Sequence, residues 1–391
     1  MSKVTKQIIP YGRQDITQED INAVIDVLKS DFITQGPTVK NFEEAVANFV
    51  GAKHGISTNS ATSSLHIACL ALGLSEGDYL WTVPNTFVAS ANCALYVGAE
   101  IDFVDINEST WNIDLEKLEQ KLKEAEKNKC LPKIIVTVAF AGQPCEQEAI
   151  RELTQRYDIR VIEDAAHAIG ASRNQEKIGS CKWSDITVFS FHPVKIITTA
   201  EGGMCLTNDP ELKDRMQLYR SHGVTRDRKK MIQENPPMWS YEQKVLGYNY
   251  RLPDLNAALG LSQLRRIDSY VNKRNSLAKI YEEQLQSLPL QLPFIQHSNI
   301  SAFHLYVVLI ESGNTQRSRE EVFIHMREHG IAVNVHYMPV YLNPYYRNLG
   351  FNKNYCKNAE SYSERAITLP LFPTMTNDQQ NVVIETIKEI L

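Results

Sequence analysis

Short runs of apolar and β-branched residues alternate with helix-like segments between residues 54 and 207. The runs predict strands at His54–Thr58, Tyr79–Val83, Glu100–Val104, Ile134–Ala139, Arg160–Glu163, Thr187–Phe189 and Met204–Thr207. Several runs lack the alternation of polar and apolar residues that marks a strand with one wet face, and helix-like segments such as 60–72, 146–157 and 210–221 separate them. This order predicts an α/β fold with a mostly parallel sheet covered on both faces.

Helical patterns flank this region on both sides. Before it, Thr17 and Asp20 predict a capped helix start, and apolar residues recur at helical spacing after them. After it, residues 223–237 predict a long loop, and one long helix is predicted from Pro253 to about Leu288. The remainder predicts a smaller α+β domain with strands at Leu305–Ile310 and Ile331–Val335 and helices near Arg319–His329 and Asp378–Leu391. We therefore expect a large domain over 1–265 and a small domain over 266–391.

Composition narrows the class of protein. The 391 residues suffice for two to three domains. The 41 Lys and Arg against 46 Asp and Glu give a net charge of −5, and the chain has no block of like charges. Because nucleic-acid binding needs a basic patch, we expect no nucleic-acid partner. Because the chain has neither a signal-like apolar segment after Met1 nor a long apolar stretch, we expect no membrane association.

Cysteine and histidine usage points to a reducing compartment. The seven cysteines are scattered and form no C-x-x-C pair, and the ten histidines include no H-E-x-x-H spacing. We expect a cytoplasmic protein with neither disulfides nor a dedicated metal site.

The segment 190–203 follows a predicted strand and carries Lys195 in the wording Ser-Phe-His-Pro-Val-Lys-Ile-Ile-Thr-Thr-Ala-Glu-Gly-Gly. A lysine in a threonine-rich loop is usually a solvated surface residue. A lysine in a concave, partly desolvated site instead loses its proton readily and forms an imine with a carbonyl group, which is how lysine enzymes hold pyridoxal phosphate. Such a site also needs an acid for the pyridine nitrogen, a phosphate cradle and an aromatic face.

Upstream segments offer these partners. Asp164 follows a predicted strand, at the end where open α/β sheets bind ligands, with a helix N-cap as the alternative. Ala61 and Thr62 begin a helix whose free amides face an anion, with a simple capped turn as the alternative. Phe87 lies at another strand-to-helix junction, where its ring stacks on a flat ligand or packs in the core. For His192, a packing role is favoured over that of a catalytic base.

The whole set resembles one family. The run from Ser190 to Gly203 and the segment Glu-Asp-Ala-Ala-His at 163–167 resemble the DegT/DnrJ/StrS family of sugar-nucleotide aminotransferases. Further matches occur in the expected order at 34–36, 59–62, 220–223, 247–251 and 261–264, so the resemblance covers almost the whole chain. The wording around Lys195 is most similar to the branch of the family in the pseudaminic acid pathway.

The resemblance implies a fold-type I, aspartate aminotransferase-like large domain that binds pyridoxal 5′-phosphate, with pyridoxamine phosphate as the aminated form. It implies that Lys195 carries the cofactor and shuttles the proton, and that Asp164 pairs with the pyridine nitrogen. It also implies that His167 lies beside the phenolic oxygen and that Phe87 stacks on the ring.

The same resemblance implies a phosphate site and an assembly. Ala61, Thr62 and Ser190 would bind the cofactor phosphate, and Asn249 would reach that phosphate from the neighbouring subunit. The active unit would then be a homodimer with shared sites.

The resemblance also implies a substrate. It indicates amination of C4 of a UDP-linked 4-keto-6-deoxy-N-acetylhexosamine with L-glutamate as donor, and His336 and Tyr337 match a family segment at the mouth of the active site. Three alternatives stay open: an aminotransferase for another nucleotide-linked keto sugar, a sugar 3-dehydratase, and a non-catalytic regulatory protein. Lys195 disfavours the dehydratase, because family members with that chemistry typically have histidine at this position.

Overall fold

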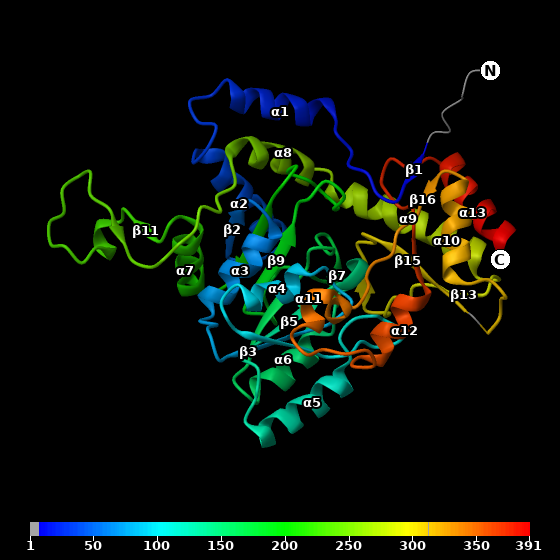
Figure 1. Ribbon diagram of the computed structural model, residues 1–391. Helices are drawn as coiled ribbons and strands as arrows, with labels where there is room; N and C mark the ends of the chain where they lie inside the picture. The colour runs from blue at the N-terminus through cyan, green and yellow to red at the C-terminus, as the bar shows by residue number, and fades with distance from the viewer. Residues whose placement is uncertain (1–7, 312) are drawn as a thin grey trace.

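The computed structural model describes residues 8–311 and 313–391, and a seven-stranded sheet lies at its centre (Figure 1). Residues 1–7 lie outside this range, so the structure does not describe the segment after Met1 that is expected not to be a signal sequence. In spatial order the strands are β2 (His54–Thr58), β10 (Gly203–Thr207), β9 (Ile186–Ser190), β6 (Arg160–Asp164), β5 (Ile134–Val138), β3 (Tyr79–Thr82) and β4 (Glu100–Phe103). Only β10 pairs antiparallel with its neighbours in this sheet. The predicted mostly parallel α/β sheet is confirmed.

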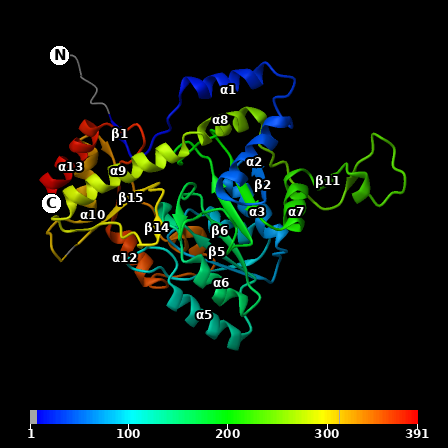
Figure 2. The same ribbon diagram turned by 180° about the vertical axis from the view of Figure 1, so that it is seen from behind.

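Both faces of the sheet are buried, as its unbroken apolar runs predict. In β9 the side chain of Val188 belongs to one apolar core and that of Phe189 to another, because successive residues of a strand point to opposite faces. The covering helices are α2 (Pro37–Val50), α3 (Ala61–Ala71), α4 (Ala89–Leu95), α5 (Leu115–Asn128), α6 (Gln147–Gln155), α7 (Pro210–Arg220) and α8 (Asp254–Leu264), and α1 (Gln18–Leu28) packs on the outside of α8. Figure 2 shows α5 and α6 on one side of the sheet and α2 and α8 on the other.

The prediction of one long helix over 253–288 is wrong in one respect. The segment forms two helices, α8 and α9 (Ile267–Leu285), with a break at Arg265 and Arg266. At the break the Arg266 guanidinium donates to the buried Asp20 carboxylate of α1 at 2.7 Å, and α9 runs on toward the small domain. The apolar periodicity continues through the break, so the sequence pattern carries no sign of it.

The C-terminal part forms a smaller α+β unit around a third apolar core. Its sheet orders β13 (Leu290–Gln291), β15 (Tyr306–Ile310) and β17 (Ala366–Leu369), all antiparallel, and its helices after α9 are α10 (Arg319–Glu328), α11 (Pro344–Arg347), α12 (Lys357–Arg365) and α13 (Asn377–Ile390). The strand expected at 331–335 is only β16 (Ile331–Ala332), which pairs with β1 (Ile9–Pro10) near the N-terminus. Ile9 therefore packs in the core of the small domain, although its place in the chain assigns it to the large one.

The loop expected after Gly223 forms an arm that projects from the body (Figures 1 and 2). Its base is a short antiparallel pair, β11 (Val224–Thr225) and β12 (Glu242–Gln243). Beyond that pair, Met238 and Trp239 are 90% and 83% exposed. The rest of the described chain therefore leaves these two apolar side chains almost uncovered.

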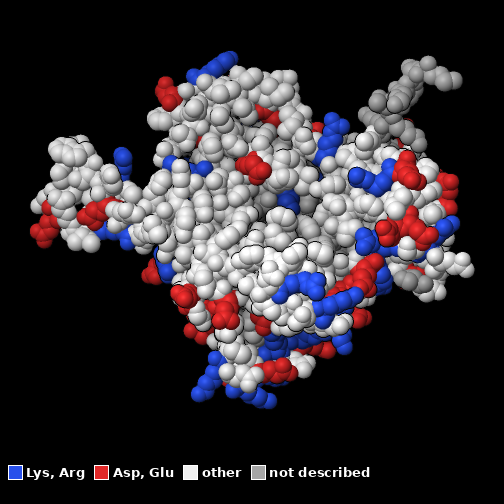
Figure 3. Space-filling view, in the orientation of Figure 1, with Lys and Arg blue, Asp and Glu red and all other residues white. Residues whose placement is uncertain are grey.

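Charged side chains are distributed without a single-sign patch on the face in Figure 3. Acidic and basic groups alternate around the edge of that face, and its middle is mostly uncharged. Among the described residues, no helix combines the length and the apolar character needed to cross a membrane.

Candidate active site

A cavity of about 620 Å³ opens where β6 and β9 end and α3 begins. The large domain supplies most of its wall, and the segment after β16 closes one side. Nine of the sequence-predicted site residues line it, namely Ala61, Thr62, Phe87, Asp164, His167, Ser190, Lys195, His336 and Tyr337. His192 lines it too, and its side chain is exposed.

Lys195 lies in the turn that follows β9, and its backbone N–H donates to the carbonyl oxygen of His192 at 2.9 Å. Its Nζ atom lies 3.5 Å from Nε2 of the buried His304. Burial lowers the pKa of Lys195 from 10.5 to about 8, and the negative charge of Asp164 limits the fall. The neutral amine, which attack on a carbonyl requires, is therefore accessible near neutral pH.

Asp164 is the last residue of β6 and is buried. Its Oδ2 accepts a hydrogen bond from Oγ of Ser90 at 2.6 Å, and its Oδ1 accepts one from the backbone N–H of Ala166 at 3.1 Å. Burial raises the pKa of Asp164, while the two hydrogen bonds and the charge of Lys195 oppose that rise. A buried carboxylate held by neutral donors suits a cationic ligand group such as a protonated pyridine nitrogen.

The N-terminus of α3 forms an anion site. Ser60 is the N-cap, and its Oγ accepts a backbone N–H of the first turn at 3.1 Å. The amides of Ala61 and Thr62 belong to the first turn, where N–H groups have no partner within the helix. The start of β10 passes so close that a Cβ on Gly203 would lie 2.5 Å from the backbone N of Ala61. Glycine at that position lets β10 pass beside the phosphate cradle, which is the pair of free amides of Ala61 and Thr62. Ser190 lines the same cavity.

Phe87 and His167 offer flat faces to the cavity. Phe87 is 59% exposed, which excludes the core position considered for it, and its ring centroid lies 6.3 Å from that of Tyr337. Burial lowers the pKa of His167 well below 6.5, so the imidazole is neutral. Its Nδ1 atom is buried without a protein partner in the described chain, and its Nε2 lies 3.5 Å from the Tyr337 hydroxyl. A flat aromatic ligand with polar ring substituents fits these groups.

The small domain supplies the opposite wall. Nδ1 of His336 lies 2.8 Å from Oγ1 of Thr368, and the His336 ring centroid lies 5.3 Å from that of Tyr11. Burial lowers the pKa of His336 to about 4 and raises that of Tyr337, so both side chains are neutral near pH 7. This wall presents hydrogen-bonding groups without a net charge.

Asn249 does not line the cavity of its own chain. Asn249 is exposed and forms an isolated β-bridge with Ser221. The next residue, Tyr250, accepts a hydrogen bond on its carbonyl oxygen from the Asn59 amide at 2.8 Å, so the segment borders the cradle turn. Its predicted action in the neighbouring subunit stays a prediction.

The sequence did not single out three residues of the cavity region: Ser90, which bonds Asp164; His304, which is 109 residues from Lys195; and Tyr11, which follows β1. None belongs to a motif with a recognisable spacing. Their positions depend on how distant segments pack, which a single sequence does not display.

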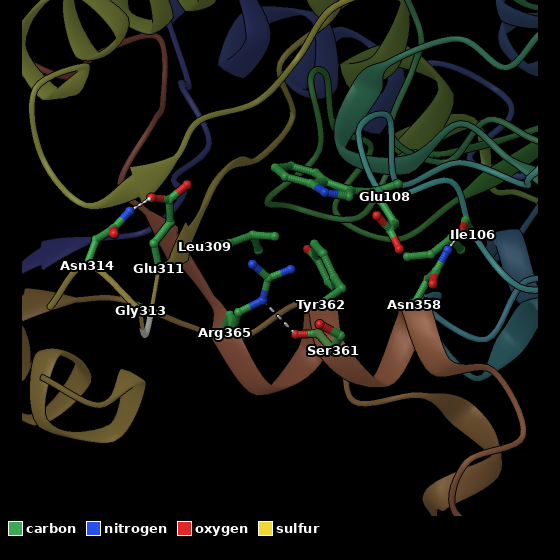
Figure 4. Close-up of a pocket in the computed structure, with 11 residues that line it drawn as sticks. Ile106, Glu108, Leu309, Glu311, Gly313, Asn314, Asn358, Ser361, Tyr362 and Arg365 are labelled. Carbon is green, nitrogen blue, oxygen red and sulfur yellow. Dashed lines mark hydrogen bonds between the residues drawn. The ribbon is translucent and has the colours of Figure 1, made fainter. Parts of the chain in front are cut away.

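A second cavity, of about 520 Å³, lies between residues 106–111 and α12 (Figure 4). Arg365 donates from Nε to the Ser361 carbonyl oxygen at 3.1 Å there, and Asn358 donates to that of Ile106 at 2.9 Å. It contains none of the predicted site residues and no lysine, and the amide of Asn358, in the first turn of α12, already donates to Asp105 at 3.0 Å. The groups suited to lysine chemistry are gathered in the first cavity.

Comparison with known proteins agrees with this geometry. The model of the DegT/DnrJ/EryC1/StrS aminotransferase family matches residues 14–388. A Campylobacter jejuni protein named UDP-4-amino-4,6-dideoxy-N-acetyl-beta-L-altrosamine transaminase is 38% identical over 385 residues, covering 98% of both chains.

Two solved structures are similar over almost the whole chain. Helicobacter pylori PseC, an aminotransferase of pseudaminic acid biosynthesis, has a TM-score of 0.89 at 31% identity, over 98% of this chain and 99% of its own. The PLP form of Streptococcus pneumoniae Spr1654 has a TM-score of 0.88 at 29% identity, over 98% of each chain. The chain belongs to the DegT/DnrJ/EryC1/StrS family and is a pyridoxal phosphate-dependent sugar aminotransferase with a fold-type I architecture.

Proposed function

We propose that this enzyme aminates C4 of a UDP-linked 4-keto-6-deoxy-N-acetylhexosamine and forms UDP-4-amino-4,6-dideoxy-N-acetyl-altrosamine. The observation that carries the aminotransferase reaction is the cavity that combines Lys195, Asp164 and the cradle at Ala61 and Thr62. The full-length similarity to the Campylobacter jejuni altrosamine transaminase and to PseC supports the choice of sugar.

In this proposal, different residues of the cavity bind different parts of the cofactor. When bound, pyridoxal phosphate supplies an electron sink for the charge left when a proton leaves carbon. In the proposed arrangement Ala61, Thr62 and Ser190 hold its phosphate. Asp164 keeps the pyridine nitrogen protonated, and Phe87 covers the ring.

Lys195 moves the proton. Its pKa of about 8 lets the amine accept a proton from carbon and return it at neutral pH. With pyridoxal phosphate bound, the Lys195 amine would take the proton from the α-carbon of the amino donor, which we propose is L-glutamate. In the second half-reaction the Lys195 ammonium would deliver a proton to C4 of the sugar.

The wall formed by Tyr11, His336 and Tyr337 is the proposed contact surface for the sugar. Its groups are neutral and half-buried or buried, which suits hydroxyl and acetamido groups better than phosphates. A loss of this wall should raise the KM for the sugar more than that for glutamate.

The test is product analysis. Purified enzyme is incubated with L-glutamate and each of several UDP- and dTDP-linked 4-keto sugars, and the products are identified by NMR. The proposal predicts a 4-amino group in the altro configuration from the UDP-linked N-acetyl sugar. Turnover of another nucleotide-linked keto sugar alone would support the second candidate. A product lacking the C3 oxygen would indicate the dehydratase.

We further propose a homodimer with shared sites. The exposed apolar side chains of the arm at Met238 and Trp239, together with the exposure of Asn249 outside its own cavity, support this assembly. The test mixes Asn249→Asp with Lys195→Ala. If Asn249 acts across the interface, half of a random mixture is mixed dimers with one intact site, and about a quarter of wild-type activity returns. No recovery after verified subunit exchange would contradict the shared site.

We also propose a cytoplasmic location. All seven cysteines are unpaired, and six of them are buried. Unpaired thiols without disulfides are typical of proteins in a reducing compartment. Fractionation of cells of the source organism, with a cytoplasmic marker enzyme as reference, tests this proposal.

A further inference from the structure

Two histidines and a glutamate meet on the small domain, where α10 packs against α13 (Figure 1). His325, His329 and Glu389 each place one nitrogen or oxygen atom within 4.8 Å of the others. The two histidines are four residues apart along α10 and its C-cap, and this spacing puts them on one face. Glu389 comes from the last turn of α13.

The separations suit a single small cation. Three atoms mutually within 4.8 Å fit inside a circle of about 2.8 Å radius, which is 4.8 Å divided by the square root of three. Zinc binds imidazole nitrogen and carboxylate oxygen at about 2.0–2.2 Å. Each ligand therefore needs to move by at most roughly 0.7 Å to reach that distance, and the Glu389 side chain is exposed.

The hydrogen bonds of the two imidazoles favour a ligand role. Nδ1 of His329 lies 2.8 Å from the carbonyl oxygen of His325. Because a carbonyl only accepts, Nδ1 of His329 carries the proton and its Nε2 keeps a free lone pair. Metal-bound histidines commonly have their second nitrogen bonded in this way. Nε2 of His325 is itself buried without a hydrogen-bond partner in the described chain.

We propose that His325, His329 and Glu389 bind one Zn²⁺ ion, with water completing the coordination. Two imidazoles, one carboxylate and an open position form a donor set that zinc accepts. The site departs from the expectation, drawn from motif spacing, that the chain has no metal site, because the third ligand comes from a helix 60 residues further along the chain.

The site lies directly before a segment that lines the active cavity. His329 is followed by Gly330, whose carbonyl oxygen accepts from the Ile9 amide at 2.9 Å, and then by β16. The chain next supplies Asn334 and His336 to the wall of the cavity. An ion that ties α10 to α13 therefore braces the element from which this wall begins, without contacting the reacting groups.

The test measures metal binding, so it does not depend on the sugar substrate. Full-length, cofactor-loaded enzyme, freed of any affinity tag and treated with a chelator, is titrated with ZnCl₂ by calorimetry and with CoCl₂ by visible absorption. We expect one ion per chain, a tetrahedral Co²⁺ spectrum and a rise in melting temperature with Zn²⁺.

Three variants decide the assignment. His325→Ala and Glu389→Gln should each weaken Zn²⁺ binding at least about tenfold and remove the Co²⁺ spectrum. His297→Ala, which removes an exposed histidine outside the cluster, should bind as wild type. Glu389→Gln alters an exposed side chain and so keeps the test valid if His325→Ala fails to fold. Absence of stoichiometric binding, or binding that Glu389→Gln leaves unchanged, would overturn the proposal.

Discussion

Gly203→Ala tests the cradle directly, because it adds a single carbon next to the proposed phosphate site. The new Cβ would lie 2.5 Å from the backbone N of Ala61 and 2.6 Å from its Cα, whereas ordinary Cβ contacts begin near 3.4 Å. The two backbone segments must therefore separate by about 0.9 Å. Backbone atoms cannot avoid the contact by changing a rotamer, so the amides at the start of α3 shift with respect to Ser190 and Lys195.

The expected effect is a specific loss of phosphate affinity. A hydrogen bond to a charged group is worth about 1.5–3 kcal/mol, so loss of one amide contact weakens pyridoxal phosphate binding roughly 10- to 150-fold. Overpacking also costs about 1–3 kcal/mol of folding stability. The assay compares the dissociation constants of pyridoxal phosphate and of pyridoxal, which lacks the phosphate, well below the melting temperature. Only the dissociation constant of pyridoxal phosphate should change strongly.

Gly313→Ala is the matched control, because a Cβ on Gly313 meets no heavy atom within 4 Å. It should leave both dissociation constants and the melting temperature unchanged. If Gly203→Ala matched Gly313→Ala in all three measurements, or weakened pyridoxal as much as pyridoxal phosphate, the close crossing of β10 and α3 would not serve the phosphate.

Further predictions concern the lysine and the acid. Lys195→Ala should retain pyridoxal phosphate non-covalently, while turnover falls by about 10²–10⁴-fold or more. Borohydride reduction should attach a pyridoxyl group to Lys195 of the wild type, and a pyridoxyl group mapped to another lysine would contradict the assignment. The rate at which apoenzyme attaches the cofactor should rise with pH through about 8, since the neutral amine reaches one half at the pKa; a midpoint near 10.5 would contradict the lowered pKa. Ser90→Ala removes the 2.6 Å bond that favours ionised Asp164, so kcat should fall roughly tenfold or more, whereas Ser276→Ala, on the exposed side of α9, should have no effect.

The order of elements and the chemistry of the large domain were readable from the sequence. Unbroken apolar runs such as Ile134–Val138 mark strands buried on both faces, because burial on both faces removes the polar alternation. The position of Lys195 after one strand and of Asp164 after another predicts that they meet, since ligand sites in such sheets lie at the carboxyl ends of the strands. The cavity confirms that meeting.

Tertiary structure decided whatever depends on contacts between distant segments. The break between α8 and α9 shows no gap in periodicity, and β1 joins the small domain through pairing with β16 about 320 residues away along the chain. Ser90 and His304 enter the site for the same reason: no local spacing links them to Asp164 or Lys195. Local sequence sets backbone preferences and burial, whereas the partner of a buried polar atom is set by packing over the whole chain.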